Sequence, residues 1–167
     1  MIPTHIGHIL MSQSDNLDLE QAHRHFAASC FNNAWGLIEK QDRTPEDEQQ
    51  MLLLAFASVW HWTQRPDCTD KHLSIGYWQV SRIYTLLSDA DNARRYARLC
   101  LDNTPTDDPF CLGYAHESLA RAAAVAYDKS SAGEHLAQAQ RLADSIESDE
   151  DRELLVNDLK TISIGSE

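Results

Sequence analysis

Apolar residues recur along most of the chain at intervals of three and four positions, the spacing that places them on one face of an α-helix. Only 6 glycines and 5 prolines occur in 167 residues. Most of them fall between the periodic stretches, which favours long helices over many short strands. The pattern predicts seven helices, at residues 16–40, 44–62, 70–87, 91–102, 108–127, 131–146 and from 148 onward.

Helix-capping residues stand at several of these boundaries. We expect Ser14 or Asp15 to cap the first helix. Thr44 precedes Pro45 and two acids, a typical helix start, because the hydroxyl accepts a backbone N–H and acids interact favourably with the helix dipole. Pro66 closes the second helix, and the acidic run after Ser148 opens the last one.

Two stretches of the chain repeat one another, with Tyr77 in the first corresponding to His116 in the second. The first has the pattern Tyr77-x2-Val80-Ser81-x2-Tyr84, then Ala93-x3-Ala97, then Pro105. The second has His116-x2-Leu119-Ala120 followed by Ala132-x3-Leu136. These match the tetratricopeptide pattern of a large residue, small residues and a proline in a helix–turn–helix unit, without its usual glycine. Small residues at the repeated positions allow two helices to approach closely.

The pattern therefore predicts an all-α fold of stacked antiparallel helical hairpins of tetratricopeptide-like type. The first helix pair is a further, more diverged unit in this interpretation, and the seventh helix caps the exposed end of the stack. We favour this arrangement over a closed four-helix bundle. Residues 14–167 form one domain of ordinary size, preceded by a flexible N-terminus at residues 1–13.

Several segments resemble a family of small bacterial all-helical proteins with tetratricopeptide-like repeats. The resemblance covers about residues 44–162 and implies a fold and a bacterial cytosolic location, but no reaction. The segments that carry it are Val59-Trp-His-Trp, Gly76-Tyr-Trp-Gln-Val-Ser-Arg-Ile-Tyr, Ala97-Arg-Leu-Cys-Leu, Gly113-Tyr-Ala-His-Glu-Ser-Leu-Ala-Arg-Ala and Asp151-Arg-Glu-Leu-Leu.

Charge and composition narrow the classes of partner and the location. A net charge of −12 disfavours nucleic acid and anionic membranes, because phosphate groups would be repelled. No stretch has the length of a membrane span or the basic start of a signal peptide, so we expect a cytoplasmic protein. Its four cysteines, Cys30, Cys68, Cys100 and Cys111, then remain reduced. We expect Cys100 to be a buried thiol, and Cys68 and Cys111 to lie nearer to loops and to be more exposed.

In stacked helical hairpins, the first helix of each pair lines a groove. Trp78 and Arg82 share one face of such a helix, and Glu117 and Arg121 occupy the equivalent face of the next, with Tyr114 one turn earlier. Two guanidiniums beside aromatic rings suit a carboxylate, a phosphate or an acidic chain end. A structural role competes with this one and is favoured: Glu117 would pair with Arg121 along its helix, or with Arg82 across the hairpins.

Other candidate chemistry is weaker. His61 lies between two tryptophans without an adjacent acid or nucleophile, so packing or helix capping explains it better than catalysis. Glu20-x-x-His23 has the spacing found in di-iron bundles, but no second such motif exists and surface histidines explain it better. We predict no metal and no cofactor.

The sequence thus favours a non-enzymatic scaffold or adaptor module that binds a protein or peptide partner, with an acidic or carboxylate group as the candidate point of contact. The sequence leaves self-association open, because a short stack has an apolar face at one end. The alternative is an enzyme or small-ligand protein with an inter-helix pocket around His61, Arg82 and Glu117.

Overall fold

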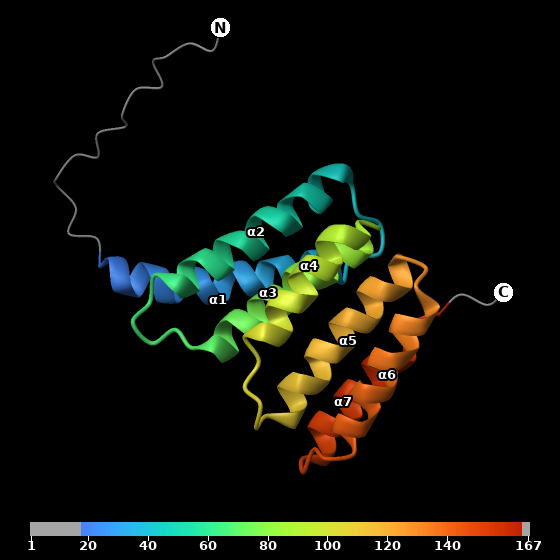
Figure 1. Ribbon diagram of the computed structural model, residues 1–167. Coiled ribbons are helices and arrows are strands. Elements are labelled where there is room, and N and C mark those ends of the chain that lie inside the picture. Colours follow the sequence, from blue (N-terminus) through green and yellow to red (C-terminus); the bar gives the residue numbers. More distant parts are fainter. Residues whose placement is uncertain (1–17, 165–167) are drawn as a thin grey trace, which may run out of the picture.

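The computed structural model describes residues 18–164, and within them all regular structure is helical. The seven helices follow one another as consecutive hairpins (Figure 1). Their bounds are α1 Leu19–Ile38, α2 Pro45–Thr63, α3 Asp70–Leu86, α4 Ala90–Asp102, α5 Pro109–Val125, α6 Lys129–Ala143 and α7 Asp149–Lys160. The predicted all-α class and the number of helices are confirmed.

The start of the first helix differs from the prediction. The helix α1 begins at Leu19, and the carboxylate of Asp18 accepts a hydrogen bond from the backbone N–H of Gln21 at 3.1 Å. Asp18 therefore takes the capping role assigned to Ser14 or Asp15, which lie outside the described residues, as does the predicted flexible segment at residues 1–13. The expected cap of α2 is present, because Thr44 and Asp47 bond reciprocally in a capping box.

Three pairs of helices form antiparallel hairpins. In the α1–α2 hairpin, Ser58 donates a hydrogen bond to the backbone carbonyl of Ala27, and His61 meets His23, so α2 returns along α1. In the α3–α4 hairpin, Ser81 donates to the carbonyl of Ala93. The α5–α6 hairpin comes next, and α7 packs against both of its helices. Figure 1 shows α3 and α4 between the α1–α2 hairpin and the α5–α7 group.

Neighbouring first helices run side by side in the same direction. Between α3 and α5, Lys71 pairs with Asp108 just before α5, and Trp78 bonds Glu117 further along both helices. The helix α7 continues this arrangement beside α5, because Tyr114 bonds Asp158 and Arg121 bonds Thr161. The helix α7 therefore flanks α5, and the residues that follow α7 lie beside the C-terminal end of the seam between α3 and α5.

The sequence repeat is visible in the backbone. Ser88 and Tyr127, which are equivalent in the repeat, both have a positive φ, of 59° and 57°, in the left-handed region that ends α3 and α5. The next residues, Asp89 and Asp128, cap α4 and α6 through their side-chain carboxylates. Equivalent positions therefore end one helix and begin the next in both hairpins, so their register is the same.

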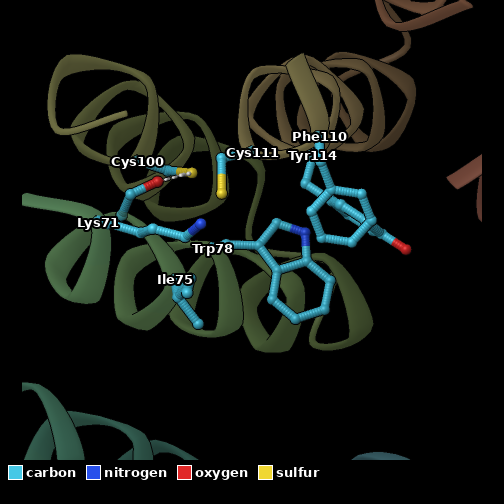
Figure 2. A pocket seen from close by; sticks show the side chains of 8 residues that line it. Lys71, Ile75, Trp78, Cys100, Phe110, Cys111 and Tyr114 are labelled. Atoms are coloured by element: carbon cyan, nitrogen blue, oxygen red, sulfur yellow. Dashed lines mark hydrogen bonds between the residues drawn. The ribbon is translucent and has the colours of Figure 1, made fainter. Parts of the chain in front are cut away.

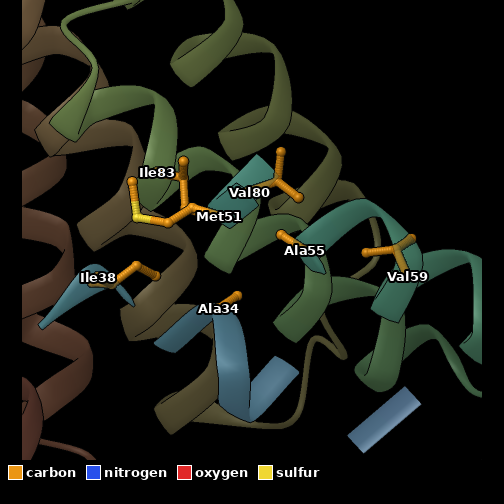
Figure 3. Packing of buried hydrophobic residues seen from close by; sticks show 7 residues of the cluster. All are labelled: Ala34, Ile38, Met51, Ala55, Val59, Val80 and Ile83. Atoms are coloured by element: carbon orange, nitrogen blue, oxygen red, sulfur yellow. The ribbon is translucent and has the colours of Figure 1, made fainter. Parts of the chain in front are cut away.

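A continuous apolar core joins the first three helices. It contains side chains from all three, which point toward one another in Figure 3: Ala34, Ile38, Met51, Ala55, Val59, Val80 and Ile83. A second cluster joins α6 to α7 through Ala139, Ala143, Ile146, Leu155 and Leu159. On α7, Leu155 and Leu159 are buried, whereas Leu154 is exposed. Each hairpin is therefore stabilised by burial against its neighbour.

Candidate functional site

The residues that were predicted to line a groove lie along the interface between α3 and α5, which we call the α3–α5 seam. Trp78 on α3 donates a hydrogen bond from its indole Nε1 to Glu117 Oε2 on α5 at 3.0 Å. The indole ring meets Tyr114 edge to face, with 5.5 Å between ring centroids, and stacks on Trp35 of α1 at the same centroid distance. The structure thus brings Trp78, Tyr114 and Glu117 into direct contact from two hairpins.

Glu117 and Arg121 form an ion pair along α5. Both residues are buried, with exposed fractions of 1% and 7%. The Nη2 of Arg121 also donates to the backbone carbonyl of Asp158 at 2.9 Å and to the Thr161 hydroxyl at 2.6 Å, at the C-terminal end of α7. The pair along α5 is the structural one expected from the sequence. The Arg121 guanidinium also holds α7 against α5, which the sequence did not predict.

Tyr114 adds a second link between α5 and α7. Its hydroxyl donates to Asp158 Oδ2 at 2.8 Å, and burial together with this carboxylate raises the pKa of Tyr114 above its usual range. Asp158 and Thr161 were not predicted from the sequence. Each is a polar residue near the end of an acidic helix, and its bond to α5 forms only because α7 docks there.

Arg82 occupies a different environment from Arg121. It is half-buried in a recess of about 430 Å³ at the C-terminal ends of α3 and α5, which Thr161 and Ile162 close from the side of α7. None of the ion pairs within residues 18–164 includes Arg82, and its guanidinium makes no hydrogen bond to any of these residues. Of the two partners considered for Glu117, the structure pairs it with Arg121, and the alternative pairing with Arg82 across the hairpins is not formed.

The charges around Arg82 leave a local excess of positive charge. Burial and then the neighbouring Arg121 guanidinium lower the pKa of Arg82, and Arg43 from the α1–α2 loop acts in the same direction. Glu117 and Asp158 oppose this effect. Among the described residues that influence this pKa most, Arg121 and Arg43 together with Arg82 itself outnumber the two carboxylates by one positive charge, on a chain whose net charge is −12. This recess, which we call the Arg82 recess, is suited to a monoanion.

A second, apolar recess lies further along the same seam, toward the N-terminal ends of α3 and α5 (Figure 2). It has a volume of about 270 Å³. Its lining residues come from α3, α4 and α5: Lys71, Ser74, Ile75, Trp78, Cys100, Phe110, Cys111 and Tyr114. Lys71 at its edge is paired with Asp108 at 2.7 Å, so its charge is balanced. We call this the apolar recess.

The two thiols of the apolar recess are poor nucleophiles. Burial raises the pKa of both Cys100 and Cys111 to about 11, so both are protonated at neutral pH. The predicted burial of Cys100 is confirmed, but the expectation that Cys111 is more exposed is wrong: it lies on the first turn of α5, facing α3. The sequence pattern missed this recess, whose shape depends on how three helices pack.

His61 does not belong to either recess. It lies in the α1–α2 hairpin, where its Nδ1 is 2.9 Å from His23 Nδ1 and its ring packs on Phe26 and Trp60. Burial, and then the neighbouring His23, lower the pKa of His61. Glu117 lines neither recess, whereas Arg82 lines one of them. The structure therefore does not gather His61, Arg82 and Glu117 around either of these recesses, as the alternative of a shared pocket requires.

The histidines and acids of the described chain do not gather into a metal site. Within residues 18–164, no three His, Cys, Asp or Glu side chains are grouped closely enough to hold a metal ion. Glu20, of the Glu20-x-x-His23 motif, instead pairs with Arg24. None of the seven described helices is both long enough and apolar enough to cross a bilayer.

The fold and the seam between α3 and α5 define the class of this protein. It is an all-α protein of consecutive helical hairpins with two recesses on one seam. No family model, no curated protein and no solved structure matches this chain. The function is therefore inferred from the residues that line the two recesses.

Proposed function

We propose that this protein is a non-enzymatic interaction module that binds a peptide or protein partner through a carboxylate group held by Arg82. The observation that carries the proposal is the Arg82 guanidinium, half-buried in an open recess without a polar partner among residues 18–164. Partial burial of an unpaired charge costs free energy. A bound anion would recover that cost, and a guanidinium offers two parallel N–H donors to a carboxylate.

The local charge favours a carboxylate over a phosphate. Glu117 and Asp158 lie close enough to Arg82 to influence its pKa, and would repel the second charge of a phosphate. One net positive charge matches one carboxylate. Arg121 contributes positive charge to the recess rather than donors to the ligand, because its own donors are bonded to Glu117, Asp158 and Thr161.

We further infer that the hairpins are of tetratricopeptide type and that the protein acts in the cytoplasm. The equivalent turns at Ser88 and Tyr127 and the fully buried Ala93, Ala97 and Ala132 at the small-residue positions support the first inference. A bacterial source and self-association remain predictions from the sequence.

The substitution Arg82→Met tests the proposed function. The probes are acetyl-Ser-Phe-Ser-Ser-Ala with a free carboxylate and the same peptide with a C-terminal amide, titrated against the full chain by NMR. The Trp78 indole N–H reports on the seam, and Trp78→Phe identifies its signal. We expect the free acid to bind and the amide to bind about tenfold more weakly or worse, because a hydrogen-bonded charge pair is lost.

Arg82→Met should weaken the free acid to the level of the amide while the stability to urea changes little, since Arg82 has no partner within the described residues to lose. Arg98→Met is the matched control, because Arg98 is an exposed arginine on α4. Equal binding of acid and amide, or no effect of Arg82→Met, would refute the proposed function.

A further inference from the structure

We propose that the apolar recess is a second subsite for the same ligand, which holds an apolar side chain about three residues before the carboxylate bound by Arg82. This inference rests on the proposed function and specifies the partner's chemistry: an extended peptide segment with a large apolar residue, two variable residues and a terminal residue carrying the carboxylate.

Both recesses open on one seam. On α3, Ile75 and Trp78 are among the residues that line the apolar recess, and Arg82 and Thr85 are among those that line the Arg82 recess. Successive members are three or four positions apart, so they share one face of the helix. On α5, Cys111 and Tyr114 are among the residues that line one recess, and Arg121 and Val125 are among those that line the other. Tyr114 and Arg121 are seven positions apart, two helical turns, so these four also share one face.

Along α3 and α5, Trp78 and Tyr114 line the apolar recess on the side nearer to the residues of the Arg82 recess. Both side chains are partly exposed, and Trp78 is fixed in place by Glu117 and by stacking on Trp35. A peptide backbone that crosses between the recesses therefore passes over two positioned aromatic rings. Such rings contribute contact area at low cost in side-chain entropy.

The distance between the recesses sets the spacing within the ligand. Ile75 and Arg82 are two turns apart on α3, which corresponds to about 10 Å along an α-helix. An extended peptide advances about 3.3 Å per residue, so about three residues bridge the same length. With a C-terminal carboxylate at Arg82, the peptide runs parallel to α3.

The size and lining of the apolar recess suit one side chain. A volume of about 270 Å³ is below the range of about 300–1,000 Å³ that accommodates drug-sized ligands, but is sufficient for a Leu, Met or Phe side chain. Ile75, Trp78 and Phe110 supply apolar walls, and the protonated thiols add polarizable, uncharged surface. Lys71 is balanced by Asp108, so the recess does not select an anion.

The test places the apolar residue at different distances from the carboxylate. Acetyl-Ser-Phe-Ser-Ser-Ala has Phe three positions before its last residue. It is compared with a peptide in which Phe is replaced by Ala and with one in which Phe stands directly before the last residue. We expect both changes to weaken binding to the full chain about tenfold or more, because burial of one aromatic side chain is lost.

A double-mutant cycle locates the Phe side chain. Ile75 is 39% exposed, so Ile75→Ala should leave the fold intact. This substitution should weaken the Phe peptide several-fold and leave the Ala peptide unchanged. Leu53→Ala is the control, because Leu53 is exposed on α2 and should affect neither peptide.

The outcomes separate the two proposals. If the Phe and Ala peptides bind equally while Arg82→Met still weakens binding to the level of the amide, the apolar subsite is refuted and the proposed function stands. A Phe effect that Ile75→Ala does not alter places the side chain elsewhere and also refutes the subsite. If no free-acid peptide binds, the proposed function fails and the subsite fails with it.

Discussion

At the scale of single residues, two arginines at equivalent positions of the repeat have different surroundings. Arg121 is buried and bonded to three residues, whereas Arg82 is half-buried and has no polar partner within the described chain. Two residues at equivalent positions of a repeat therefore occupy the same place on their helices without having the same hydrogen-bond partners. The difference arises because Glu117 and the end of α7 lie beside Arg121.

The substitution Glu117→Leu tests the structural role of the buried pair. It leaves the Arg121 guanidinium buried without its carboxylate and deprives the Trp78 indole N–H of its acceptor. We expect the free energy of unfolding in urea to fall by about 3–5 kcal/mol. Adding Arg121→Met should recover part of this loss, because the uncompensated charge is removed. Strictly additive effects of the two substitutions would contradict a coupled pair.

At the scale of helices, close approach depends on glycines at two interfaces. A Cβ added to Gly76 on α3 would lie 2.7 Å from Val59 Cγ2 on α2. A Cβ added to Gly113 on α5 would meet Leu155 of α7 even more closely. The capping helix α7 therefore packs onto α5 at a position where only a hydrogen side chain fits without rearrangement.

Gly113→Ala should lower the free energy of unfolding by about 1–3 kcal/mol, because overpacking displaces Leu155. Gly133→Ala on α6 is a matched control: no atom lies within 4 Å of its added Cβ, so the higher helix propensity of alanine should stabilise the protein by up to about 1 kcal/mol. Both values come from urea denaturation. A stabilising effect of Gly113→Ala would show that α7 is not held as described.

At the scale of the whole molecule, histidine pairs join the helices of the first and third hairpins. His23 and His61 meet in the first hairpin, and His116 Nδ1 lies 3.1 Å from His135 Nδ1 in the third. Burial is the largest cause that lowers the pKa of His61, His116 and His135 below the ordinary value of 6.5. The neighbouring Arg141 also lowers the pKa of His116, while Glu134 opposes the effect at His135.

These shifts predict that stability decreases in mildly acidic solution. As the pH falls below about 6.5, the unfolded chain binds protons that the folded chain does not, so the free energy of unfolding falls until the pH has passed the lowered pKa values. The measurement is urea denaturation at about pH 7.5 and about pH 5, on either side of this range. The double variant His116→Gln, His135→Gln should lose less stability between these values than the wild type. An equal loss would assign the effect to other groups.

Local features of the sequence predicted much of the fold. Helix periodicity and caps such as Thr44 depend on residues within a turn or two of one another, so the sequence alone predicts them. The same is true of the Glu117–Arg121 pair at i, i+4. The partners of His61 and Tyr114 were not, because they lie far away in the sequence and depend on packing between helices. The recesses are spaces left between packed side chains, and no sequence pattern encodes them directly.

The equivalent turns of the two hairpins also indicate how a longer protein could arise from this one by duplication of a segment. Thr69 and Asp108 are N-caps at equivalent positions of two successive hairpins, so a copy of residues 70–108 inserted after Asp108 would begin and end in equivalent turns. The inserted unit would bring its own α3-like helix, with another Trp and Arg at the positions of Trp78 and Arg82. Duplication of one segment would thus lengthen the seam and add a contact for a longer partner without a new fold.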